Sequence, residues 1–151
     1  MITGPYDPKT YQPRDGIGFL LTRAKLQLLD DLDKELEPLD ITAAQYVILL
    51  RLTEVDVGSA SVLCKGVSYD PGAMTRMIDR LEKKGLVRRI RRADDRRKVD
   101  LELTAEGKTL RPKLIAAIVR VLNRRLRGFS KTEVEQFTEY LRRMVESEGG
   151  K

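Results

Sequence analysis

The residues with the most evident chemistry are the cations of one short stretch, residues 83–98. This stretch holds nine lysines and arginines against two aspartates, a net charge of +7. The whole 151-residue chain carries +6, so the remaining residues together sum to about −1. Guanidinium and ammonium groups gathered in this way bind the phosphates of a polyanion. The alternative, a solvated charged segment with no partner, is less favoured because ordinary protein surfaces mix the two signs more evenly.

A predicted helix leads into this stretch. Asp70 suits the N-cap and Pro71 the first helical position, while Gly85 suits a left-handed cap at the other end. An apolar stripe recurs at helical spacing and consists of Met74, Ile78 and Leu81. Thr75 and Arg76 are therefore left on the outward side, in the first turns of the helix.

Two short strands are predicted on either side of the basic segment 91–98. Val99, Leu101 and Leu103 alternate with polar residues, which is typical of a half-buried strand. In the preceding strand, one face is expected to hold Leu86, Arg88 and Ile90. A helix followed by a basic hairpin is the shape of a winged helix-turn-helix. The predicted fold is thus mostly α with a small β-hairpin wing; its helix would enter a major groove and its wing a minor groove.

Several short motifs here occur together in one known family. They are Thr75-Arg76, Asp79-Arg80-Leu81-Glu82, Lys84-Gly85-Leu86-Val87, Asp95-Arg96-Arg97, and Leu103-Thr104 with Gly107. With them, the chain resembles the MarR family of bacterial transcriptional regulators, and a looser resemblance extends from Asp40 through Gly107. The resemblance implies a homodimer, a winged helix-turn-helix in each subunit, a palindromic DNA site, and often repression relieved by a small ligand or an oxidant.

The helix should contact DNA through its first turns. The guanidinium of Arg76 could bind guanine in bidentate fashion or clamp a phosphate, with Thr75 beside it. Gly72 and Ala73 are small enough for their backbone amides to approach a phosphate. Arg80 is included among the DNA-facing residues, although with Asp79 and Glu82 it fits a surface charge network better than base reading.

The wing should contact DNA through its tip. The family's Asp-x-Arg pattern maps onto Asp95 and Arg97; the resemblance implies that the arginine enters the minor groove and that the aspartate orients it. Phosphate contacts are assigned to the remaining cations, Arg91, Arg92, Arg96 and Lys98.

Enzyme chemistry finds little support in the composition. The chain has no histidine, which removes histidine-based catalysis and histidine metal ligands, and it has no Gly-rich phosphate loop or Cys-x-x-Cys pair. We therefore expect no catalytic site, cofactor or metal. Cys64, the one cysteine, is interpreted as a small buried hydrophobe and not as a redox switch. No segment has the length and hydropathy of a membrane helix or a signal peptide, so we expect a soluble cytoplasmic protein.

Further helices should surround this unit. Residues 16–37 form a long amphipathic helix after a proline-containing arm, which is either disordered or packed across a partner subunit. Residues 42–52 form a helix with a capping box, 55–59 a connector, 61–67 the first helix of the helix-turn-helix, and 68–69 its turn. The helix after Thr104 should present a seam in steps of four, namely Leu110, Leu114, Ile118, Leu122 and Leu126. A last helix should follow the capping box at Ser130.

This order predicts a single structural domain with three regions: an arm and dimerisation helix (1–38), a DNA-binding region (39–104) and C-terminal dimerisation helices (105–151). The terminal helices carry more apolar surface than the winged region can cover, which favours a two-fold dimer over a monomeric core. Its two recognition helices would lie about one DNA turn apart, roughly 34 Å.

An effector pocket is implied by the resemblance, between the dimer helices and the DNA-binding region. A carboxylate on an aromatic ring would need an arginine and an aromatic wall, and the candidates are Tyr6, Tyr11, Arg14, Arg23 and Tyr46. The alternative is that Arg23 is a paired structural cation and Tyr46 a core residue.

The sequence thus predicts a ligand-responsive homodimeric regulator, taken as a repressor, that binds double-stranded palindromic promoter DNA and responds to a small aromatic or phenolic acid. A sequence-tolerant architectural DNA-binding protein without a ligand is the alternative.

Overall fold

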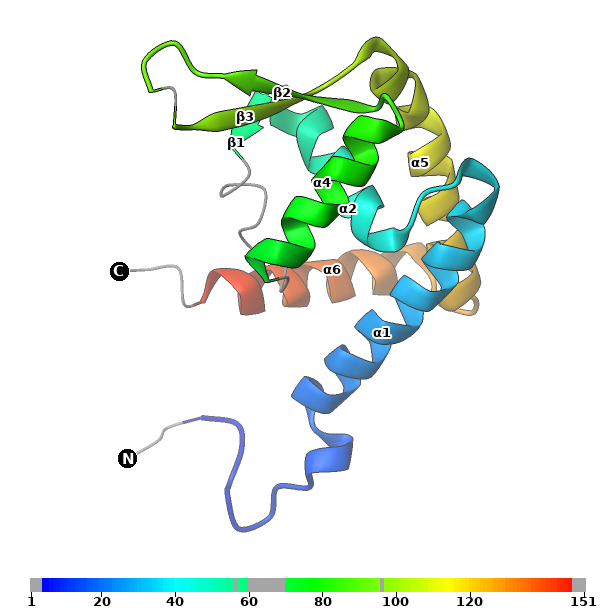
Figure 1. The fold of residues 1–151 in the computed structure, drawn as a ribbon. Helices are drawn as coiled ribbons and strands as arrows, with labels where there is room; N and C mark the ends of the chain where they lie inside the picture. Colours follow the sequence, from blue (N-terminus) through cyan, green and yellow to red (C-terminus); the bar gives the residue numbers. More distant parts are fainter. Residues whose placement is uncertain (1–3, 56, 60–69, 96, 148–151) are drawn as a thin grey trace.

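The computed structural model describes residues 4–55, 57–59, 70–95 and 97–147 (Figure 1). The helices are α1 (Ile17–Leu36), α2 (Ala43–Val55), α4 (Pro71–Lys83), α5 (Ala105–Arg125) and α6 (Lys131–Glu146). The strands are β1 (Val57–Ser59), β2 (Val87–Arg91) and β3 (Val99–Leu103), and two 3-10 turns span Pro13–Asp15 and Glu37–Leu39. The predictions for residues 61–69, including Cys64, lie outside the described residues.

One apolar core joins the second half of α1 to α2, α4, α5 and the sheet. In Figure 1 the sheet lies across one end of α2 and α4. The largest fully buried side chains are Leu36, Ile48, Leu49, Leu52, Leu81, Val87, Leu101, Leu114 and Val121. The stripe on α4 is confirmed, since Met74, Ile78 and Leu81 are all buried. The core therefore holds α4 by one face and leaves its other faces exposed.

The helix starts follow from local capping, as predicted. Thr42 and Gln45 form reciprocal side-chain–backbone bonds of 3.1 Å at the start of α2. Thr104 accepts from the Gly107 amide at the start of α5, and Ser130 forms a complete capping box with Glu133 at the start of α6. Each side chain satisfies an amide that the first helical turn leaves without a partner.

The sheet has one strand more than the predicted hairpin. β1 pairs antiparallel with β3, so the order is β1-β3-β2, and residues 57–59 are not a plain connector. The expectation that Leu86 shares a strand face with Arg88 and Ile90 is also wrong, because the strand begins at Val87. Val87 lies opposite Leu103 and is 1% exposed, so the inner face belongs to the odd-numbered residues of β2.

The inner face of α5 also differs from the predicted seam. Leu114, Ala117 and Val121 are buried, whereas Leu122 is 36% exposed. Steps of four residues advance 400° around a helix and drift by 40° at each step, so a strict four-residue seam leaves the core side after two or three steps. Ala117 and Val121, which are fully buried, restore the helical period that the four-residue pattern does not follow.

Two glycines have a conformational role at the junctions beside α4 and α5. Gly85 has φ +71° and ends α4 in the left-handed region, as predicted. Gly107 lies so close to the loop between α4 and β2 that a Cβ atom there would be 2.2 Å from the Leu86 carbonyl oxygen. This contact lets α5 begin directly against the start of the wing.

Apolar side chains remain exposed on the terminal helices. They are Ile17, Phe19, Leu20 and Leu26 on α1, Ile115, Val119 and Leu122 on α5, and Phe137, Tyr140, Met144 and Val145 on α6. No residue of α6 is buried. None of the helices in the described part of the chain has the length and hydropathy of a membrane-spanning segment.

Candidate nucleic-acid interface

The first turn of α4 is held by its cap. The Asp70 side chain has an Oδ1 that accepts from the Ala73 amide at 2.9 Å. The backbone amides of Gly72 and Ala73 are both predicted to approach a phosphate. The Ala73 amide is engaged by the Asp70 cap, whereas the Gly72 amide takes no part in that hydrogen bond. Thr75 is exposed and donates its hydroxyl to the Pro71 carbonyl at 2.9 Å, so this hydroxyl proton is engaged within the helix.

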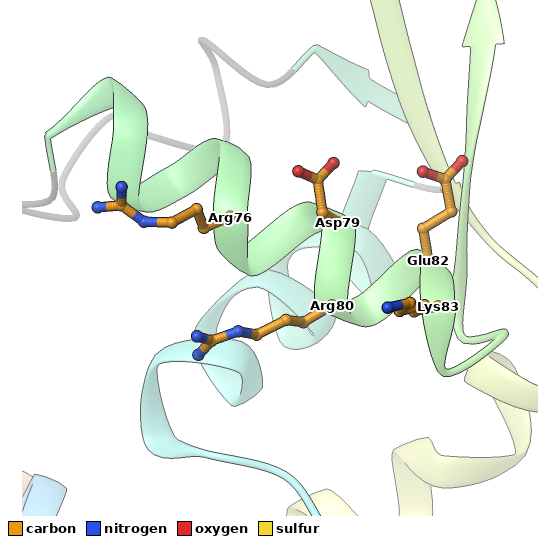
Figure 2. Close-up of a pocket in the computed structure, with 5 residues that line it drawn as sticks. All are labelled: Arg76, Asp79, Arg80, Glu82 and Lys83. Atoms are coloured by element: carbon orange, nitrogen blue, oxygen red, sulfur yellow. The ribbon is translucent and has the colours of Figure 1, made fainter.

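The charged residues of α4 fall into two rows (Figure 2). Arg76 and Arg80 extend to one side of the helix, while Asp79 and Glu82 point to another. Together with Lys83 they line a shallow groove along the exposed side of the helix. In the part of the chain that the structure describes, no ion pair is formed by Arg76 or Arg80.

The acidic row is neutralised by a residue that the sequence analysis did not single out. Arg89 of β2 donates from one terminal nitrogen to Asp79 Oδ1 at 2.5 Å and from the other to the Glu82 carboxylate. The hydrogen bond to Asp79 is the largest cause of the raised pKa of Arg89. The sequence does hold a signal for this contact, because two acids lie three positions apart on a helix that is followed by a cationic strand. The predicted network on α4 therefore involves Arg89 and not Arg80.

The wing tip is shaped by its own backbone and side chains. Lys98 donates its amide to the Asp95 carbonyl at 2.9 Å, and Arg97 donates its amide to Asp95 Oδ1 at 3.0 Å. The Asp95 carboxylate thus accepts a hydrogen bond from the backbone amide of Arg97. The resemblance implies a contact to the Arg97 guanidinium instead. Arg97 and Lys98 are exposed, as is Arg91 at the end of β2. Arg96 lies outside the described residues.

Arg92 is tied into the wing itself. Its Nε and a terminal nitrogen bind the two Asp94 oxygens at 2.9 and 2.8 Å, and Asp100 lies 3.9 Å away. The bond from Arg92 is also the main reason why the pKa of Asp94 is lowered. Fewer cations are therefore available to a partner than the nine lysines and arginines of residues 83–98 suggest.

The five predicted effector residues are not gathered in one place within the chain. Tyr6 and Tyr11 meet edge to face at 5.1 Å and line an apolar groove with Pro8, Ile17, Gly18 and Met144. Arg14 lies in the adjoining 3-10 turn, and Arg23 lies further along α1 over the Phe19 ring. Tyr46 is 6% exposed, and burial raises the pKa of its hydroxyl, which agrees with the alternative that it is a core residue.

Comparisons with known proteins agree with this geometry. The model of the MarR family matches residues 41–99. Multiple antibiotic resistance protein MarR of Escherichia coli is 43% identical over 76 residues, which are 50% of this chain and 53% of that protein. The chain therefore spans about half the length of this curated relative.

Two further matches extend over more of the chain. An uncharacterised HTH-type transcriptional regulator of Bacillus subtilis, YhbI, is 34% identical over 112 residues, which are 74% of this chain and 70% of that protein. The crystal structure of a mutant E. coli MarR complexed with operator DNA superposes with a TM-score of 0.74 at 32% identity, covering 85% of this chain and 92% of the other. The predicted winged-helix fold is thereby confirmed, with a three-stranded sheet in place of the hairpin, and the chain belongs to the MarR family.

Proposed function

We propose that this protein is a homodimeric transcriptional regulator, acting as a repressor, that binds palindromic promoter DNA in the cytoplasm. In this proposal α4 enters the major groove and the tip of the β2–β3 wing reaches the minor groove. The observation that carries it is the charge arrangement of α4: its acids are paired with Arg89, while Arg76 and Arg80 extend into the exposed groove. An exposed helix with cations on one side suits base and phosphate contacts.

The proposed contacts follow from where the predicted residues lie. Arg76 is assigned to a base or phosphate, Arg80 to a phosphate, and the Gly72 amide to a phosphate near the helix start. On the wing, Arg97 is assigned to the minor groove, and Arg91 and Lys98 to the backbone. The operator complex of E. coli MarR supports the assignment, because that chain superposes on 85% of this one with a TM-score of 0.74.

The proposed dimer would bury the exposed apolar side chains of α1, α5 and α6. No residue of α6 is buried within one protomer, so α6 is little stabilised there, because burial of apolar surface is the main source of stability. A two-fold arrangement would place the α4 helices roughly 34 Å apart. Regions 1–38 and 105–151 then serve dimerisation and 39–104 serves DNA binding.

An aromatic acid is the proposed effector. The groove between Tyr6, Tyr11 and Met144 offers an apolar wall, and Arg14 lies in the turn next to it. A ligand held between the arm and the dimer helices would act by favouring a separation of the two α4 helices that does not match DNA. Titration calorimetry with simple phenolic acids, repeated on Arg14→Ala and Arg23→Ala, tests this assignment.

Footprinting on the DNA upstream of the protein's own gene tests the function. The proposal predicts a protected palindrome that loses protection when an effector is added. Uniform protection without a boundary would instead favour the alternative of an architectural DNA-binding protein. Sedimentation as a monomer at micromolar concentration would contradict the proposed dimer.

A further inference from the structure

We infer that Arg89 is a positioning residue that locks the recognition helix and the wing into one rigid DNA-reading unit. This inference rests on the proposed DNA binding and adds a residue that touches no DNA. Arg89 lies at the centre of β2, and its two terminal nitrogens bind Asp79 and Glu82, which lie on α4 three positions apart.

The register of the sheet directs Arg89 toward the helix. Arg89 pairs with Leu101 of β3, and it therefore shares the inner face with Val87. Its side chain is 32% exposed, less than those of Asp79 at 55% and Glu82 at 40%. A planar guanidinium that binds two carboxylates three positions apart on a helix restricts both the rotation of the helix and its separation from the strand. The clamp thus fixes the angle between α4 and the strands that carry the wing tip.

The same clamp has an electrostatic effect on α4. Asp79 and Glu82 lie close to the cationic row of Arg76 and Arg80 in Figure 2, and carboxylates without a partner there would repel DNA phosphates. The two possible roles of Arg89, neutralising charge and positioning the wing, predict opposite changes in DNA affinity when Asp79 and Glu82 are removed. If only charge mattered, removing two negative groups would tighten DNA binding. If the clamp positions the wing, their removal weakens binding.

The deciding variant is therefore Asp79→Asn/Glu82→Gln, measured by fluorescence anisotropy on the footprinted DNA at constant salt. We expect its affinity to fall by about fivefold or more. The matched control is Asp30→Asn/Glu139→Gln, which removes the same charge from two exposed ion pairs on α1 and α6. We expect the control to bind within about twofold of wild type. Unchanged or tighter binding by the Asp79/Glu82 variant would overturn the inference.

A second readout asks whether the wing loses its function when the clamp is broken. Arg97→Ala should cost about tenfold in affinity in the wild-type background but about threefold or less in Arg89→Gln, because an unfixed wing no longer delivers Arg97 to the groove. Equal losses in the two backgrounds would contradict positioning. If Arg89 served only to stabilise the fold, Arg97→Ala would cost the same factor in affinity in both backgrounds.

Hydrogen exchange on the free protein separates this inference from the proposed function. Arg89→Gln should speed exchange of the amides of β2 and the wing tip while leaving those of α2 protected. Unchanged wing exchange would overturn the clamp even if DNA binding were lost. Failure of the wild-type protein to bind any DNA would contradict the proposed function instead, and the exchange result would still decide whether the clamp orders the wing.

Discussion

Arg125, at the end of α5, donates from Nε to Oδ2 of Asp31 on α1 at 2.5 Å, across 94 positions of sequence. One turn further along α1, Glu35 accepts from Arg120 at 2.5 Å and from Arg124 at 2.8 Å. These hydrogen bonds lower the pKa of Asp31, chiefly through Arg125, and that of Glu35, chiefly through Arg120. Ion pairs thus join α1 to α5, the long helix that follows the wing.

Acid should weaken the fold through these pairs. Because both carboxyls have a pKa below its ordinary value in the folded state, they contribute stability above an ordinary carboxyl pKa of about 4, and this contribution is lost as pH falls through the lowered values. The thermal midpoint of the wild type should therefore fall more steeply below about pH 5 than that of Asp31→Asn/Glu35→Gln. Parallel curves for the two proteins would show that the ion pairs do not join α1 to α5 in solution.

Gly107→Ala should destabilise the junction between the wing and α5. The added Cβ would meet the Leu86 carbonyl oxygen at 2.2 Å, so the backbone must shift. We expect a loss of about 1–3 kcal/mol in the free energy of unfolding, measured by urea denaturation. Gly18→Ala is the matched control, since nothing lies within 4 Å of its Cβ position and alanine favours a helix. Equal stability of the two variants would refute the close approach.

Arg76→Ala should weaken DNA binding without affecting the fold. Its guanidinium is exposed in the groove on α4, and truncation should cost about 1–3 kcal/mol of binding free energy. Arg142→Ala, an exposed arginine on α6, is the control and should bind as wild type does. Wild-type affinity of the Arg76 variant, with circular dichroism unchanged, would mean that α4 does not enter the groove in this orientation.

Arg97→Ala should weaken binding and reduce its dependence on salt. A guanidinium in the minor groove lies between the two phosphate backbones and neutralises about one phosphate charge, which adds about 0.9 to the slope of log affinity against log salt. Loss of Arg97 should therefore flatten the slope by about that amount. Gel shifts over a series of salt concentrations measure the slope, with Lys131→Ala on α6 as the exposed control. A wing held away from DNA would give an unchanged slope.

Local patterns predicted α4 well. The cap at Asp70, the stripe of Met74, Ile78 and Leu81, and the left-handed Gly85 each depend on interactions within a few residues, and all are confirmed. The same holds for the capping boxes that begin α2 and α6.

Features set by distant partners were harder to predict. β1 has three residues, too few for a periodic signal, and exists because β3 offers a free edge. The Arg89 clamp depends on the register of β2 against β3, which places odd-numbered residues toward α4. In the wing, composition revealed the cations but not that Arg92 is held by Asp94.

The most direct test of DNA recognition is the ratio of affinities for the protected palindrome and for random DNA of the same length, measured by anisotropy at physiological salt. A family regulator that reads bases through α4 should give a ratio above about 10³. A ratio near one would contradict sequence-specific regulation, because contacts to the phosphate backbone alone do not distinguish sequences.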